Sequence, residues 1–102
     1  MSGTDVFKAY HQAYKKALEI HHKWEHGDEA KLLKQANELR DAVKPLAELV
    51  GKDWNRSQNL ERHLNCVPYY LERNEKYAAN SDINDLIYAD LPALADELLK
   101  LA

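Results

Sequence analysis

The densest group of side chains suited to chemistry lies between positions 19 and 26. Glu19, His22 and His26 are spaced three and four residues apart, so a helix would present all three on one face. Imidazole and carboxylate groups both suit zinc or iron, and three of them on one face could hold a transition metal. A di-iron bundle needs Glu-x-x-His on two helices, and this chain has it only at Glu19–His22. The competing interpretation is a solvated polar strip, under which we expect no cofactor.

A second pair with catalytic potential is Arg56 and His63. Seven residues are nearly two helical turns, so the two side chains would share a face. This pair resembles the Arg-x4–6-His motif of HEPN-domain ribonucleases, which are all-α proteins that dimerise to bring two such motifs together. The resemblance implies metal-independent RNA cleavage, with His63 transferring a proton and Arg56 holding the scissile phosphate. The chain departs from the family at Ser57, where Asn, Asp or His is common, and the competing interpretation is an exposed helix surface.

Length and charge restrict the class of protein. The chain has 102 residues, enough for one domain spanning residues 1–102, and carries 14 Lys and Arg against 17 Asp and Glu. A net charge of -3 argues against binding to duplex DNA or to an anionic membrane through a basic field. The single cysteine, Cys66, excludes an intramolecular disulfide and fits a reducing compartment. We therefore expect a cytoplasmic protein.

Apolar residues in the first half recur at helical spacing. Thr4 is a predicted N-cap of the first helix, and Gly27 is predicted to end it. Asp28 is predicted to cap a second helix, in which Pro45 favours a kink over a break. Two such helices joined by a short turn predict an antiparallel hairpin. The two apolar stripes are Phe7, Tyr10, Tyr14, Ala17, His21 and Trp24, then Leu32, Ala36, Leu39, Val43, Leu46 and Val50.

The second half continues the helical pattern. Residues 51–55 form a predicted connector in which Trp54 packs inward. Pro68 marks a kink or a restart within the third helix, and residues 80–82 are the predicted loop before the fourth. Pro92 lies near a predicted restart after Asp90. The stripes are Leu60, Leu64, Val67 and Leu71, then Ile83, Ile87, Leu91, Leu94, Leu98 and Leu101. The fold class is therefore all-α, with four main helices in an up-and-down bundle and proline kinks in the later helices.

Tyrosine and acidic residues gather around the expected junction of the third and fourth helices. Residues 81–102 hold one basic residue against five acidic ones, and the chain has six Tyr but one Phe. Tyrosine suits partly exposed contacts because its ring packs while its hydroxyl stays hydrogen-bonded. The candidate interface comprises Tyr69, Tyr70, Tyr77, Tyr88, Asp82 and Asp85.

These observations favour a small non-enzymatic interaction module, such as an adaptor, an inhibitor, an immunity-type protein or an accessory subunit. Its expected partner is another protein or a second copy of the chain in a homodimer. RNA is a partner only under the ribonuclease alternative.

Overall fold

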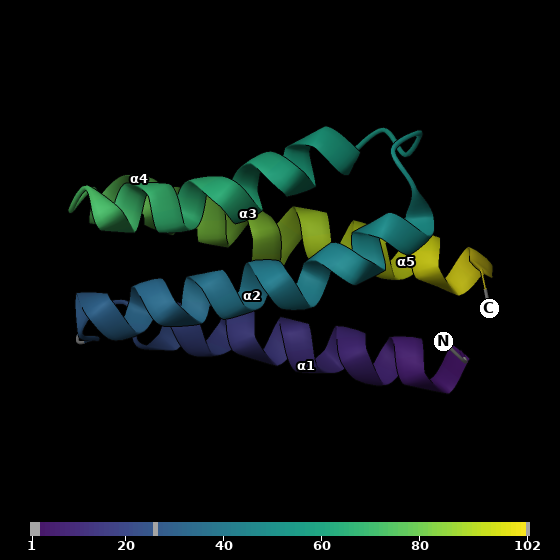
Figure 1. The fold of residues 1–102 in the computed structure, drawn as a ribbon, viewed down its shortest axis with the longest axis horizontal. Helices are drawn as coiled ribbons and strands as arrows, with labels where there is room; N and C mark the ends of the chain where they lie inside the picture. Colours follow the sequence, from purple (N-terminus) through teal and green to yellow (C-terminus); the bar gives the residue numbers. More distant parts are fainter. Residues whose placement is uncertain (1–2, 26, 102) are drawn as a thin grey trace.

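The computed structural model describes residues 3–25 and 27–101, and over these residues it contains helices and no strands. The helices are α1 (Gly3–His22), α2 (Glu29–Val50), α3 (Ser57–Glu72), α4 (Lys76–Asp85), the π-helical turn η1 (Leu86–Asp90) and α5 (Leu91–Leu101). Since α4, η1 and α5 follow one another without a gap, they form one rod. Four rods alternate in direction, which confirms the predicted all-α bundle (Figure 1). Among the described residues, no helix combines the length and the apolar character needed to cross a bilayer.

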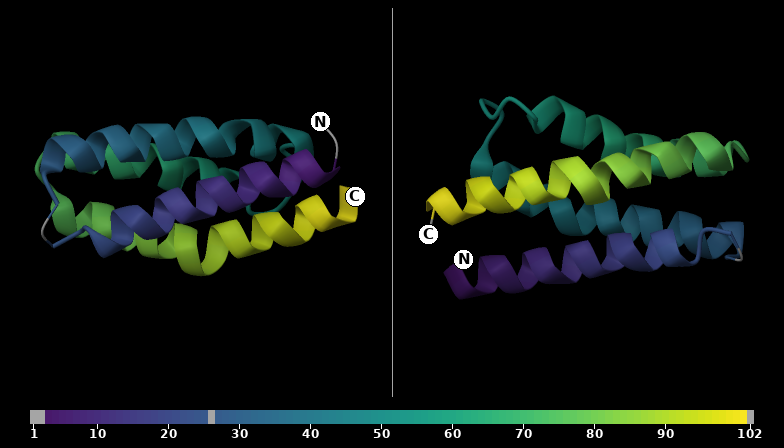
Figure 2. Two further views of the ribbon diagram at one scale, coloured as in Figure 1. Left: turned by 90° about the horizontal axis from the view of Figure 1, so that it is seen from below. Right: turned by 180° about the vertical axis from the view of Figure 1, so that it is seen from behind.

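The core lies where the helical stripes meet. Within the predicted stripes, the side chains at most positions are buried, including Ala17, Leu39 and Leu64. Trp54 in the connector is half-buried and packs against this core, as predicted. The first two helices form the predicted antiparallel hairpin, and the two ends of the described chain lie at the same end of the bundle (Figure 2). The periodic burial of these residues supplies most of the driving force for packing the rods together.

The predicted helix ends are partly right. Asp28 is the N-cap of α2, and its side chain accepts a hydrogen bond from the backbone N–H of Ala30. The assignment of Thr4 as an N-cap is wrong, because helix α1 already includes Gly3 and Thr4 is exposed within the first turn. Helix α1 ends at His22, ahead of Gly27. A Cβ on Gly27 would lie 2.5 Å from the Lys23 carbonyl oxygen, so the turn between α1 and α2 needs glycine at this position.

The three prolines have different consequences. Helices α2 and α3 continue through Pro45 and Pro68, so neither proline breaks its helix. Ahead of Pro92 the helix widens instead, and the Leu91 N–H donates to the Leu86 carbonyl five residues back. A proline ring crowds the carbonyl four residues before it, and a π turn spreads the backbone at that point. The predicted restart after Asp90 is therefore a change of helix type.

The predicted loop at residues 80–82 is wrong. These residues lie inside α4, between the buried side chains of Ala79 and Ile83. The chain instead turns between α3 and α4 at residues 73–75, where Asn74 adopts a positive φ of 58°. Packing of Ala79 and Ile83 into the core outweighs the weak helix propensity of Asn80, Ser81 and Asp82. This shift matters for function because it places Asp82 on a helix that faces α3.

Candidate functional site

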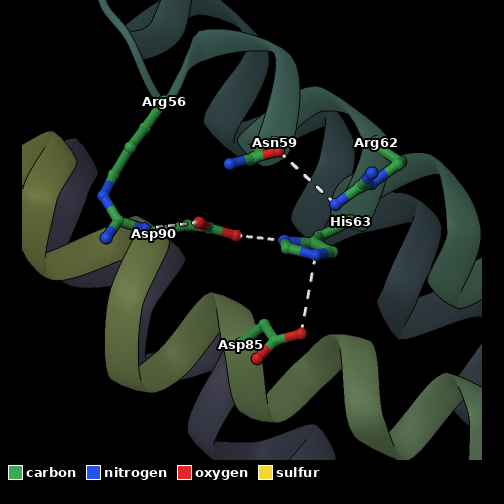
Figure 3. Close-up of polar contacts among 6 residues, drawn as sticks. All are labelled: Arg56, Asn59, Arg62, His63, Asp85 and Asp90. Carbon is green, nitrogen blue, oxygen red and sulfur yellow. Dashed lines mark hydrogen bonds and ion pairs between the residues drawn. The ribbon is translucent and has the colours of Figure 1, made fainter.

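Arg56 and His63 converge on the carboxylate of Asp90 (Figure 3). An Arg56 Nη1 lies 3.6 Å from Asp90 Oδ1, and His63 Nδ1 is hydrogen-bonded to Asp90 Oδ2. Because an ionised carboxylate can only accept, Nδ1 is the donor in this hydrogen bond. The Asp90 side chain is 1% exposed, whereas that of Arg56 is 45% exposed. Asp90 thus fixes the imidazole orientation from inside the bundle, while Arg56 reaches it from the surface.

The opposite edge of the His63 ring faces helix α4. His63 Nε2 lies 3.5 Å from Asp85 Oδ2, and the Asp85 side chain is 54% exposed. Asp82, one turn earlier on α4, belongs to the same cluster, since one ligand atom each from His63, Asp82 and Asp85 lie within 4.8 Å of one another. We call Arg56, His63, Asp82, Asp85 and Asp90 the His63 cluster. Its three acidic members all come from the α4–η1–α5 rod.

Helix packing and the π turn position this cluster. Helix α3 packs against α4 and η1, and His63 lies on the same face of α3 as the buried Leu60 and Val67. In η1 the wider turn leaves both Asp90 and the adjacent Leu91 buried. Asp90 is therefore buried inside the π turn, directly beside a core leucine.

Burial sets the electrostatics of the cluster. Loss of solvent raises the pKa of Asp82, and the negative charges of Asp85 and Asp90 raise it further against the lowering effect of His63. Burial also raises the pKa of the Cys66 thiol, with Asp82 adding to the shift. Asp82 Oδ2 is inaccessible to solvent and has no hydrogen-bond partner within residues 3–25 and 27–101. The negative charges of Asp85 and Asp90 next to Asp82 therefore favour a positive charge at this position.

The pair predicted on α3 is brought together, whereas the predicted metal face is only partly described. Arg56 and His63 share a face, joined through Asp90. Ser57, the point of departure from the HEPN motif, is half-buried as the first residue of α3. Glu19 and His22 are exposed on α1, and His26 lies outside the described residues. The sequence thus identified His63 as a site residue but associated it with Arg56 alone.

The six residues of the predicted interface lie in different surroundings. The rings of Tyr69 and Tyr70 contact each other, and the Arg73 guanidinium stacks over Tyr69. The Tyr88 ring contacts His21 of α1 edge-on. Tyr77 is 92% exposed at the start of α4. Asp82 and Asp85 face His63, so these two carboxylates belong to the His63 cluster.

Asp90 is the functional residue that sequence reasoning missed. From the sequence, Asp90 was expected only as one of five acidic residues and as the residue before a helix restart, although its position carries a further signal. Asp90 interrupts the apolar series Ile83, Ile87 and Leu94 at helical spacing, where a buried side chain is expected. A carboxylate in such a position is seldom buried without a partner. His63, next to Leu64 of the preceding stripe, was the candidate hydrogen-bond partner in the sequence.

A separate hollow of about 640 Å³ lies between α2 and α3. Its wall includes Arg40, Lys44, Glu48 and Glu61, so positive and negative side chains alternate around it. None of the five residues of the His63 cluster lines it. Comparisons of the chain with protein families, curated proteins and solved structures found no match.

Proposed function

We propose that this protein acts by binding another protein through the outer surface of the α4–η1–α5 rod. The observation that carries the proposal is the exposure of large side chains on this rod, three of which are evenly spaced along it. Tyr77, Tyr88 and Leu99 are 92%, 72% and 59% exposed. We call these three residues the outer strip. Aromatic side chains exposed to this extent are typical anchors of protein interfaces.

The spacing of the outer strip supports a continuous contact surface. Its members are spread along the rod at intervals of 11 residues, with one each in α4, η1 and α5. The opposite side of the rod carries the core residues Ile83, Ile87 and Leu94. The rod therefore has one face that packs into the bundle and another along which a partner helix or sheet edge could lie.

The charges on the rod suggest how such a contact is stabilised. Asp82 and Asp85 face His63, and Glu97 is paired with Lys100 at 3.2 Å. Few acidic groups are left to attract a basic partner. Docking would therefore depend mainly on burial of rings and leucine, which contributes about 25 cal/mol per Å² of apolar surface removed from water.

The ribonuclease alternative has one observation in its favour, the convergence of Arg56 and His63. Three carboxylates surround the imidazole, however, and its two ring nitrogens both face carboxylate oxygens. A phosphodiester approaching His63 would meet negative charge from Asp82 and Asp85. The interaction function is therefore better supported than RNA cleavage by the arrangement of charges.

Site-specific photo-crosslinking tests the proposal. A photoreactive phenylalanine analogue replaces Tyr77 or Tyr88 in the full chain, and a matched variant carries it at Lys34, an exposed position on α2. We expect one defined adduct from positions 77 and 88, absent at position 34. An adduct of twice the mass of the chain would indicate a homodimer. Equal labelling at all three positions, or none at 77 and 88, would contradict the proposal.

A further inference from the structure

The structure assigns a divalent transition-metal site to His63, Asp82 and Asp85. This inference goes beyond the proposed interaction function and does not depend on it. One imidazole nitrogen and two carboxylate oxygens form a donor set that suits Zn²⁺ and its first-row neighbours. Mg²⁺ and Ca²⁺ prefer oxygen ligands alone, so the imidazole favours the transition ions.

The separation of the donor atoms fits shared coordination. Zinc bonds to nitrogen and oxygen of about 2.0–2.2 Å place two tetrahedral ligands about 3.3–3.6 Å apart. His63 Nε2 and Asp85 Oδ2 are 3.5 Å apart, which lies within this range. The largest distance among the three donor atoms is at most 4.8 Å. The Asp85 side chain is 54% exposed, so it has room to adjust its position around an ion.

Asp82 supplies an independent indication of a cation. Its Oδ2 is buried and lacks a hydrogen-bond partner among the described residues. An unpaired buried carboxylate oxygen costs free energy, and a bound cation removes this cost. Asp82 and Asp85 are three residues apart on α4, so they present their carboxylates to the same neighbouring helix.

The remaining two members of the cluster complete the surroundings of the site. Asp90 accepts the Nδ1 proton of His63, which leaves Nε2 as the nitrogen that faces Asp85. Carboxylate–histidine–metal arrangements of this kind orient the ring and increase the basicity of the ligand. Arg56 neutralises the other oxygen of Asp90. The exposed side of Asp85 gives the ion a route from solvent and leaves room for water as a fourth ligand.

Zinc titration of the full chain by isothermal calorimetry tests this assignment. We expect one Zn²⁺ per chain at neutral pH. Asp85→Asn should weaken binding at least tenfold, because it removes a charged ligand from an exposed position without disturbing the core. Asp53→Asn, at an exposed position in the connector, is the matched control and should bind as tightly as the unaltered chain.

A second control separates this site from the histidines of the first helix. His22→Gln should leave both stoichiometry and affinity unchanged, because His22 is exposed on α1 and is not part of the His63 cluster. Loss of binding in His22→Gln would place the metal on α1 and overturn the assignment. Absence of saturable binding in the unaltered chain, or equal affinity in Asp85→Asn, would overturn it as well.

Discussion

Removing His63 and Asp90 singly and together tests whether they stabilise the fold as a pair. In His63→Leu, the Asp90 carboxylate stays 1% exposed and keeps only the Arg56 contact at 3.6 Å. In Asp90→Leu, His63 keeps only Asp85 at 3.5 Å. Leaving a buried polar group without its hydrogen-bond partner costs about 1–3 kcal/mol, and more when the group is charged. Because one weaker partner remains in each case, we expect each single variant to lose about 2–4 kcal/mol.

The double variant should lose about 2 kcal/mol less than the sum of the two single losses. Leucine at both positions leaves neither His63 nor Asp90 as a buried polar group without its partner, so that part of the cost is absent. We expect a coupling free energy of about 2 kcal/mol, toward the upper end for residues in contact. Since a domain of this kind has a total stability of about 5–15 kcal/mol, this coupling is well above measurement error.

The coupling is obtained from a double-mutant cycle. Urea-induced unfolding followed by circular dichroism gives the free energy of unfolding of the unaltered chain, the two single variants and the double variant. Lys16 and Glu38 provide a matched control, because their ion pair at 3.3 Å links α1 and α2 but both side chains are about half-exposed. Coupling in such a pair should stay below about 0.5 kcal/mol. If the His63–Asp90 coupling were no larger than that of Lys16–Glu38, the buried pair would not stabilise the packing of α3 on the rod.

Three further outcomes follow from local contacts. Tyr10 donates its hydroxyl hydrogen to the Leu91 carbonyl at 2.7 Å, and burial raises its pKa to about 12. As the pH rises, the Tyr10 hydroxyl of the unfolded chain therefore ionises at a lower pH than that of the folded chain. The free energy of unfolding should be constant below pH 10 and fall between about pH 10 and 12. In Tyr10→Phe, this fall in the free energy of unfolding between pH 10 and 12 should be absent when urea unfolding is measured at a series of pH values. Gly51 has a φ of 93° and a ψ of 171°, and Gly51→Ala should cost about 1–3 kcal/mol in a urea titration, whereas Gly3→Ala should change little. Asp28→Ala removes the α2 cap and should lower the melting temperature, at a cost of about 1 kcal/mol.

The fold was largely predictable because burial of apolar side chains at helical spacing is a strong and local signal. It located all four rods and the hairpin. Helix ends were less predictable, since they depend on partners distant in sequence. Residues 80–82 have the composition of a loop, yet Ala79 and Ile83 pack into the core and hold them in α4. The actual turn at Asn74 has no glycine or proline to mark it.

The candidate site was predictable only in part. Arg56 is the N-cap of the helix that holds His63, so their common face could be predicted from spacing. Asp82, Asp85 and Asp90 lie on another rod, and their approach to His63 depends on how α3 packs against α4. The π turn adds a residue that helical periodicity does not anticipate, and Asp90 lies buried in this turn beside Leu91.

The central claim is that Asp90 holds the His63 ring so that Nε2 faces a cation. NMR of the histidine side chains tests this claim most directly. Among the five histidines, the account predicts one ring with a proton fixed on Nδ1 and protected from exchange. That signal should disappear in Asp90→Leu, and zinc should shift the Nε2 resonance of the same ring. Five freely exchanging imidazoles, or a zinc response confined to the histidines of the first helix, would contradict it.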